Sequence, residues 1–351
     1  MSNLSDDMAV SKPYKLIPFP DERPNLDRPA GHEKFRSDSL HGTLFLKLIV
    51  QTPLHVSTGL VVMGDDIGNS SIHLIKTMTQ GIKEKLIIQG SSLKGCIRSV
   101  YEAITNSTLG VISRDYERQI QKKNLPYGQR ESLCQKTKLC PASRVFGALN
   151  WQGLVEFTDA KCERLYSIGF MPSLYSPQPK INDRTLSPEY FDDNGKVRGR
   201  KFYYQTSRSV DAGEQRGIPV QQAGTEYTFS TQLQFMNLKP EELGILLIVL
   251  GQDSQYRIAL KVGAGKPVGM GTMTVEITEA RVVQGKDELR ERYSAYNLTG
   301  TGSLTENTLQ EFIRQKIKAA HNSNLIEKNQ LEEIVKVLGY PTNRLPVEGE
   351  Y

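Results

Sequence analysis

Residues 226–238 read EYTFSTQLQFMNL, residues 240–252 read PEELGILLIVLGQ, and residues 271–283 read GTMTVEITEARVV. The first and third stretches alternate apolar and polar side chains, which is the pattern of a strand with one buried face. The middle stretch is a continuous apolar run of helical length, and a glycine-rich connection separates it from the last strand. The order therefore predicts a strand, a helix, a turn and a strand, which together make one βαβ unit.

A second unit of the same kind precedes this one. TLFLKLIVQTPLHV, from Thr43, predicts a buried strand, and LVEFTDAK (154–161) predicts another. Between them, QGSSLKGCIRSVYEAIT (89–105) predicts a helix behind a cap formed by Ser91 and Ser92. The apolar side chains at helical spacing are Leu93, Ile97, Val100 and Ile104. Two such units fit the split βαβ, or ferredoxin-like, plan, an α+β fold in which helices cover one face of the sheet.

The composition of the 351 residues, 38% hydrophobic and 24% charged, is that of a globular protein. No stretch approaches the roughly 18 apolar residues of a membrane span, and the start MSNLSDDMAVSKPYK lacks the apolar core of a secretory signal. We therefore expect a cytoplasmic protein with no membrane partner. The cysteines are too few for a disulfide scaffold and are expected to be free thiols. They are Cys96, Cys134, Cys140 and Cys162.

Changes in composition divide the chain into three parts. Residues 1–42 are rich in proline and charge and predict an extended N-terminal arm, and residues 43–285 contain the core. Residues 286–351 predict a helical C-terminal extension that begins with a capping box of Ser303 and Glu306. Its apolar stripe predicts packing against the core or against a neighbouring protein, and includes Leu309, Ile313, Ile317 and Ala320.

Two segments inside the core are unusual. Residues 111–144 contain eight basic and three acidic residues, so this segment alone carries +5, equal to the net charge of the whole chain. Residues 162–225 are rich in proline and tyrosine and too long for an ordinary connection, so they form either a functional insertion or a partly disordered one. A basic surface permits a polyanionic partner without requiring one.

The connection KVGAGKPVGMGTM (261–273) could present backbone N–H groups to phosphates. It is not a Walker A loop, because no Gly-Lys-Ser/Thr begins a helix there, and a tight connection between helix and strand explains it equally well. Its candidate phosphate contacts are Lys261, Gly263, Gly265, Lys266, Gly269 and Gly271.

Small residues and cations also begin the helix at 90, where an anion could bind near the N-terminus. The alternative is an ordinary cap with exposed cations. The candidates at this helix are Ser91, Ser92, Lys94 and Arg98.

The stretch KVRGRKFYY (196–204) combines cations with aromatic rings, as proteins that bind single-stranded nucleic acid do. A solvated charged strand is the alternative interpretation. The candidate contacts here are Lys196, Arg198, Arg200, Lys201 and Tyr203, and Arg144 is added from the basic segment.

Two further patterns concern metals. Cys134 and Cys140 have the spacing of part of a zinc knuckle, but Ser143 stands where another cysteine is needed, so structural zinc is disfavoured. The adjacent acids Asp65 and Asp66 could hold Mg²⁺ for cleavage of a phosphodiester, or could simply form a turn.

Three motifs occur in an order and spacing that resemble the RAMP superfamily of CRISPR-associated proteins. GSSLKGCIR resembles the family pattern PGSSLKGxxR, CPASRVFGALNWQGLVEFTDA resembles a CPxCxxFG motif followed by a DA pair, and GAGKPVGMGTM resembles the terminal GxGKSRGxGxv. The resemblance spans about Thr43 to Val283. Among RAMP proteins, the order TPLHVSTG, loop, GSSLKG is most similar to the backbone subunits of type III effector complexes.

This resemblance implies a modified RNA-recognition fold that binds a guide crRNA and its paired target RNA beside other effector subunits, with no small-molecule substrate. The helix at Ser91 would hold guide phosphates beside the 263–271 loop, and residues 162–225 would supply an inserted thumb. Two other activities stay open: a metal-dependent target-RNA endoribonuclease that uses Asp65 or Asp66, and a crRNA-processing endoribonuclease with a histidine base such as His55 or His73.

The sequence departs from the family at places that matter for chemistry. In active backbone subunits an aspartate precedes GSSLKG in a pattern like IDxPVIKD, whereas this chain has IGNSSIHLIK, so Asn69 or Ser70 takes that place. Asp65 and Asp66 come several residues earlier, and we therefore favour a non-cleaving subunit. Pro267 and Val268 replace the usual Ser-Arg pair, which removes one cation.

Overall fold

The computed structural model describes residues 12–109, 124–125, 134, 137–174, 185–284, 290 and 303–347. In this part of the chain the largest sheet has eight strands, in the order β14–β15–β2–β13–β9–β5, with β16 beside β15 and β8 beside β13. Each of these neighbouring pairs is antiparallel. The strands are β2 (Leu40–Val50), β5 (Ile87–Ile88), β8 (Val155–Phe157), β9 (Ala160–Cys162), β13 (Thr228–Leu238), β14 (Leu260–Lys261), β15 (Thr272–Gln284) and β16 (Ser303–Leu304).

The alternation in sequence explains why these strands share one apolar face. Leu48 of β2 lies opposite Phe229 of β13 on one side and Val275 of β15 on the other. Leu44, two pleats away on β2, lies opposite Leu233. Successive side chains of a strand point to opposite faces, so these positions all face the helices, and most of them are fully buried.

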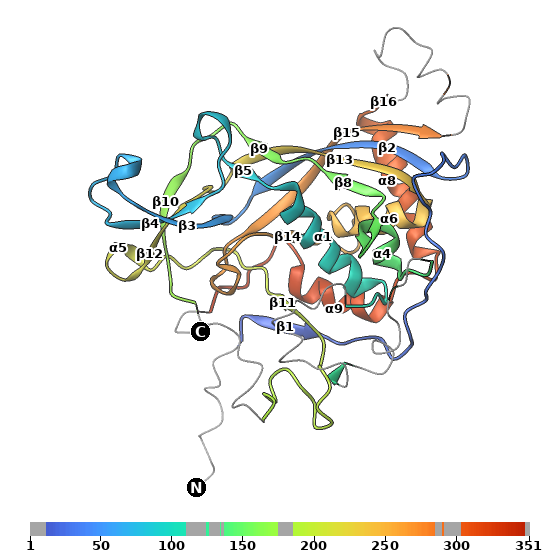
Figure 1. The fold of residues 1–351 in the computed structure, drawn as a ribbon, viewed down its shortest axis with the longest axis horizontal. Coiled ribbons are helices and arrows are strands. Elements are labelled where there is room, and N and C mark those ends of the chain that lie inside the picture. The colour runs from blue at the N-terminus through green and yellow to red at the C-terminus, as the bar shows by residue number, and fades with distance from the viewer. Residues whose placement is uncertain are drawn as a thin grey trace.

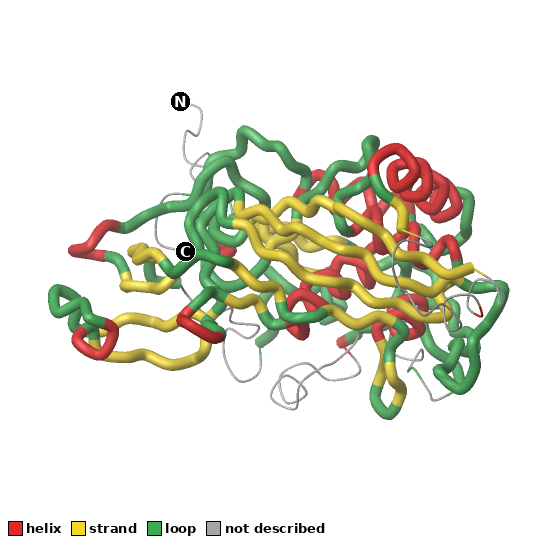
Figure 2. The backbone as a smooth tube through the Cα atoms, turned by 90° about the horizontal axis from the view of Figure 1, so that it is seen from above, coloured by secondary structure: helices red, strands yellow, loops and turns green. Residues whose placement is uncertain are grey.

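The helices gather on that face of the large sheet (Figures 1 and 2). Helix α6 (Pro240–Val249) is buried along most of its length, as its continuous apolar run predicts, and packs against α1 (Gly90–Ile104) and α8 (Glu306–His321). Helix α9 (Lys328–Leu338) packs on α1, and α4 (Pro141–Phe146) lies beside α1. The structure therefore confirms that the C-terminal apolar stripe packs against the core, because side chains of α8 and α9 belong to the main hydrophobic cluster.

A second sheet lies at one end of the molecule, in the order β10–β12–β4–β3. Its strands are β3 (Ser57–Met63), β4 (Leu74–Met78), β10 (Ser167–Met171) and β12 (Ile218–Gln222). The short helix η1 (Asp65–Ile67) connects β3 and β4. The β3–β4 hairpin exposes large apolar side chains with exposed fractions between 53% and 65%, namely Leu60, Val61, Met63 and Leu74.

The remaining elements are small. Strand β1 (Tyr14–Ile17), in the N-terminal arm, pairs antiparallel with β11 (Arg200–Tyr203), and β6 (Gly147–Ala148) pairs with β7 (Trp151–Gln152). The short helices are η2 (Ile82–Glu84), α5 (Gly213–Arg216) and η4 (Lys266–Val268). No helix in the described part of the chain is long and apolar enough to cross a membrane.

The mixed helix and sheet class is as predicted, but local details correct the sequence analysis. Ser91 and Ser92 do not cap α1; they lie in its first turn, and the Asp159 carboxylate accepts the Gly90 N–H at 2.9 Å. The strand predicted over 154–161 is two strands, β8 and β9, because the antiparallel pairing with β13 shifts register by one residue between Phe157 and Lys161.

At α8 the capping box uses Thr305 and Thr308 rather than Ser303 and Glu306, because Ser303 pairs in β16 and Glu306 is the first helical residue. The predicted domain boundaries stay predictions. Parts of the arm, of the 111–144 and 162–225 segments and of the start of the extension lie outside the described residues.

The close crossing of α6 and α8 generates a test of the C-terminal packing. A Cβ atom at Gly244 would lie 2.0 Å from the Lys316 carbonyl oxygen, which is backbone and cannot rotate away. We expect Gly244→Ala to lower the free energy of unfolding by about 1–3 kcal/mol, because the helices must separate. Urea unfolding followed by circular dichroism measures this change.

Gly95→Ala is the matched control, since a Cβ at Gly95 of α1 meets nothing within 4 Å. Alanine is preferred over glycine inside a helix by about 0.5–1 kcal/mol, so this variant should be slightly more stable than the wild type. Equal stability of the two variants would contradict a close α6–α8 crossing.

Candidate functional site

A groove of about 470 Å³ lies between α1 and the glycine-rich connection. One wall is the exposed face of α1, and the other is the chain at 262–266. Its lining is made almost entirely of small side chains, so backbone is accessible from within it. The lining residues are Val56, Ser57, Ser91, Ser92, Gly95, Cys96, Ser99, Val262, Gly263, Ala264 and Lys266.

The glycine-rich connection is held tightly against the chain at 53–55. Ala264 N–H donates to the His55 carbonyl oxygen at 2.9 Å, and Gly271 N–H donates to the Pro53 carbonyl oxygen at 2.9 Å. Gly263 has φ of +76°, and a Cβ there would lie 2.4 Å from the His55 carbonyl oxygen. Glycine is required for this close approach. The tight-connection interpretation therefore holds here, and contact with phosphate stays a prediction.

Two lysines of this connection have different environments. Lys261 is buried, and its Nζ donates to the Gly269 carbonyl oxygen and to Thr272 Oγ1, each at 3.2 Å. Burial, helped by the nearby Lys266 cation, lowers the pKa of Lys261 to about 7. Lys266 is only half-buried and lines the groove, and it forms no ion pair with any residue that the structure describes.

The start of α1 contributes hydroxyl groups to the groove rather than cations. Ser91 is exposed, Ser92 is half-buried, and both line the groove together with Ser99, two turns further along. The Lys94 side chain instead turns away, because its Nζ donates to the Val155 carbonyl oxygen at 2.8 Å. Burial is the main reason that the pKa of Lys94 is lowered.

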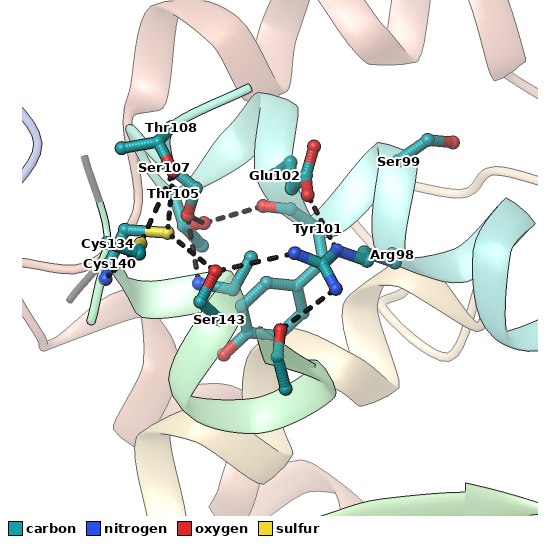
Figure 3. Close-up of polar contacts among 12 residues, drawn as sticks. Arg98, Ser99, Tyr101, Glu102, Thr105, Ser107, Thr108, Cys134, Cys140 and Ser143 are labelled. Carbon is teal, nitrogen blue, oxygen red and sulfur yellow. Dashed lines mark hydrogen bonds and ion pairs between the residues drawn. The ribbon is translucent and has the colours of Figure 1, made fainter. Parts of the chain in front are cut away.

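Arg98 belongs to an internal network rather than to the groove (Figure 3). Its Nε donates to Glu102 Oε1 at 2.7 Å and its Nη1 donates to the Gly147 carbonyl oxygen at 2.9 Å. Arg200 donates to the other oxygen of Glu102 at 2.9 Å and to the Ser107 carbonyl oxygen. Burial lowers the pKa of Arg200, and the Glu102 carboxylate opposes that shift.

Arg144 is also buried, between the arm and α6. Its ion-pair distances are 3.4 Å to Asp27 and 3.5 Å to Glu242. Three of the predicted RNA contacts, Arg98, Arg144 and Arg200, thus use their charge inside the protein in this conformation.

A family model of the RAMP superfamily matches residues 47–274, which is well over half of the chain and includes both walls of the groove. The chain belongs to the RAMP superfamily. One similar solved chain comes from a structure described as "Cryo-EM structure of the Type III-B Cmr-beta bound to cognate target RNA", with 16% sequence identity and a TM-score of 0.33. The match covers 70% of this chain and 61% of that one, so this RAMP protein spans less than two thirds of the length of that chain. A search of curated protein sequences gave no match.

The basic and aromatic stretch at 196–204 of this RAMP protein packs mainly against β1 and against the chain just before it. Lys201 Nζ lies 3.8 Å from the centre of the Tyr14 ring and 5.1 Å from that of Tyr203, an arrangement favourable for cation–π attraction. Burial lowers the pKa of Lys201. The Nε of Arg198 donates to the Phe191 carbonyl oxygen at 2.8 Å, and Lys196 is half-buried in the same stretch.

Asp65 and Asp66 lie far along the hairpin from the groove. Ser57, the first residue of β3, lines the groove, and the two acids follow the last residue of that strand. The seven residues of β3 span about 20 Å at a rise of roughly 3.3 Å per residue. Both carboxylates are exposed, and the Asp65 carbonyl oxygen accepts the Gly68 N–H within the turn, as the turn-former interpretation expects.

The groups named for the two alternative chemistries lie in different surroundings: Asp65, Asp66 and His73 are exposed on the β3–β4 hairpin, and His55 is buried. No group of three histidine, cysteine or acidic side chains that could hold a metal ion occurs in the described residues. His55, beneath the glycine-rich connection, is buried, and its Nδ1 lies 2.6 Å from the Gln221 carbonyl oxygen. Burial lowers the pKa of His55, and no RNA can reach it in this conformation.

Several groove residues were not among those predicted from the sequence. Val56, Ser57, Ser99 and Ala264 line it, and Asp159 caps the helix beside it. Ser99 could have been predicted from the sequence. Small residues recur at three- or four-residue spacing along one face of α1, at Ser91 or Ser92, Gly95 and Ser99.

The buried lysine predicts a pH dependence of stability. Between pH 7 and 10.5 the unfolded chain keeps a proton on Lys261 that the folded protein has lost, so stability should rise with pH across this window. The destabilisation of the folded protein that comes from burying the charged form of Lys261 is fully present below pH 7. We expect Lys261→Met to weaken this rise by up to roughly 1.4 kcal/mol per pH unit, measured by urea unfolding between pH 7 and 9.

Lys318→Met is the control for this comparison, because Lys318 is an exposed lysine on α8 and is not among the groups that shift the pKa of Lys261. Its stability should follow the wild-type pH dependence closely. A Lys261→Met variant with an unchanged pH dependence would show that Lys261 stays protonated in the folded protein.

Proposed function

We propose that this RAMP protein is a backbone subunit of a type III CRISPR effector complex, which holds a guide crRNA and its paired target RNA beside other effector subunits. The observation that carries the proposal is the groove between α1 and the glycine-rich connection, which joins two of the three family motifs in one surface. A cytoplasmic location follows from this function as an expectation.

We also propose that the core is ferredoxin-like. The chain order β2, α1, β8 and β9, β13, α6, β15 is βαββαβ, and the spatial order β15–β2–β13 followed by β8 and β9 is antiparallel. Both helices pack on one face of this sheet. This arrangement supports the split βαβ plan expected from the sequence.

The groove suits a phosphate backbone because small side chains line most of its walls. Small side chains allow a sugar-phosphate chain to approach the protein backbone closely, and serine hydroxyls can donate to phosphate oxygens. Lys266 adds a cation that no described residue neutralises by an ion pair. These contacts read no base edge, so binding should not depend on the guide sequence.

The Asp159 carboxylate changes how an anion would be held at α1. It already accepts the Gly90 N–H, and its negative charge stands at the end of the helix that would otherwise attract phosphate. The phosphate contacts of this proposal are therefore Ser91, Ser92, Lys266 and the Gly263 backbone, because the Ser99 hydroxyl donates to the Cys96 carbonyl oxygen and the Ala264 N–H to the His55 carbonyl oxygen. Lys94, Arg98, Arg144, Arg200 and Lys261 are left out, because their polar groups bind within the protein.

The aromatic stretch and the predicted thumb remain proposals for contacts with RNA or with a neighbouring subunit. Residues 185–225 contribute β11, α5 and β12 to the described structure, and 175–184 lie outside it. The stretch from Lys196 to Tyr203 would have to exchange its internal contacts for RNA contacts.

The contribution of Lys266 can be measured as a salt dependence. Each phosphate neutralised on a single strand contributes about 0.7 to the slope of log K against log salt concentration. We expect Lys266→Ala to lower that slope by about 0.7 and to weaken binding of RNAs of different sequence equally. Fluorescence anisotropy with labelled single-stranded RNA over a series of salt concentrations measures both.

Lys318→Ala is the matched control, because Lys318 is an exposed lysine on α8, away from the groove walls. It should leave the slope unchanged.

Gly95→Leu tests the groove itself, since space is open above Gly95 and the side chain would fill it. Gln310→Leu on α8 is its control. Unchanged RNA affinity in both Lys266→Ala and Gly95→Leu would remove the groove from the RNA path.

We further propose that this subunit does not cleave RNA at the β3–β4 loop. Metal-assisted cleavage needs a carboxylate within reach of the metal or the attacking hydroxyl, and Mg²⁺ would be held here by Asp65 and Asp66 alone among the described acids and histidines. In the assembled complex with Mg²⁺ and a matched target RNA, Asp65→Ala/Asp66→Ala should give the same cleavage products as the wild type. Loss of one product with RNA binding intact would identify this pair as the catalytic site.

A further inference from the structure

Two thiols outside the groove lie together at the start of α4. The Cys140 N–H donates to Cys134 Sγ at 3.3 Å, and the Thr108 hydroxyl oxygen lies 3.4 Å from each sulfur. Figure 3 shows the two sulfur atoms side by side near Thr108. Neither forms a disulfide in this structure. They therefore need little movement to react with each other.

The two sulfurs differ in access and in chemistry. Cys140 is completely buried, whereas Cys134 is half-buried, so a solute reaches Cys134 first. Cys140 Sγ shares a hydrogen bond of 3.3 Å with Ser143 Oγ. The hydrogen bonds that Cys140 shares with Cys134, Ser143 and Thr108 lower its pKa, and the contact with Cys140 raises the pKa of Cys134, so the proton of the pair is held on Cys134 and the negative charge on Cys140.

A metal site is the competing use for such a pair. Tetrahedral zinc needs four ligands, and among the described residues no third cysteine, histidine or acid joins these two sulfurs. The remaining neighbours, Thr108 and Ser143, are hydroxyl groups. This environment favours thiol exchange over metal binding.

We propose that Cys134 and Cys140 form a reversible disulfide by exchange with a small-molecule disulfide such as oxidised glutathione, with Cys134 as the entry thiol and Cys140 as the resolving thiol. Cys134 gives its proton to the Cys140 sulfur and attacks one sulfur of the small disulfide, whose S–S bond breaks. One half leaves and takes up a proton. Cys140 then attacks Cys134 Sγ, losing its proton, and the second half leaves as a thiol.

The net reaction is balanced. The pair, which starts with one proton on its two sulfurs, loses two electrons and that proton, and the small disulfide gains two electrons, this proton and one proton from solvent and becomes two thiols. The proposal does not depend on RNA binding. The pair is nonetheless one contact from α1, since Ser143 Oγ also lies 3.4 Å from Arg98 Nη2.

The full-length protein itself provides the test. It is equilibrated in buffers with graded ratios of reduced to oxidised glutathione, alkylated, and digested with trypsin, which cuts between the two cysteines after Lys136 and Lys138. We expect the peptides ESLCQK (131–136) and LCPASR (139–144) to become linked as the buffer becomes more oxidising and to separate again on reduction. Cys96 and Cys162 should stay alkylated throughout.

Alkylation of both peptides at every ratio would overturn the proposal, and so would linkage of either cysteine to Cys96 or Cys162. Zinc in the purified protein that is released only when both thiols are modified would overturn it as well.

The order of attack is tested separately. Cys140→Ser should accumulate glutathione on Cys134, whereas Cys134→Ser should leave Cys140 unmodified. If either variant does not fold, a brief exposure of the wild type should trap glutathione on the 131–136 peptide, and glutathione on the 139–144 peptide instead would reverse the assigned order.

Discussion

Two guanidinium groups meet on the Glu102 carboxylate inside this protein, and several parts of the fold depend on that meeting. Arg98 approaches from α1 at 2.7 Å and Arg200 from β11 at 2.9 Å. Removing the carboxylate would leave two largely buried cations without compensation, a change that typically costs about 3–5 kcal/mol. Strand β11 pairs with β1, and Arg98 also contacts the Gly147 carbonyl oxygen, so one side chain joins the arm, the first helix and the end of α4.

The regular part of the fold could be predicted because burial on one side imposes a period on the sequence. Helix α1 spans Gly90–Ile104 where 89–105 was expected, and β13 and α6 follow the predicted order. The pairing of β1 with β11 could not be predicted, because it joins distant segments with no shared pattern. The Asp159 cap was missed for the same reason, since its partner Gly90 is remote in sequence.

The candidate site was harder to predict because a sequence shows cations without showing which are already paired. Lys261 and Lys266 stand in the same short loop, yet one donates to Gly269 and Thr272 inside the protein while the other lines the groove. The two lysines differ in desolvation, which depends on the path of the chain around each side chain. The groove is instead defined by small residues, which charge counting ignores.

Strand β3 is the last strand of the second sheet, so among the described residues no other strand pairs with the side of β3 that faces away from β4. Its sequence STGLVVM contains no proline, lysine or other charged residue, the usual means by which proteins make such an edge unattractive to other strands. Leu60, Val61 and Met63 lie exposed along the same edge. A strand of another chain can therefore pair with this edge in the isolated protein. Aggregation at high concentration should depend on whether that edge is covered.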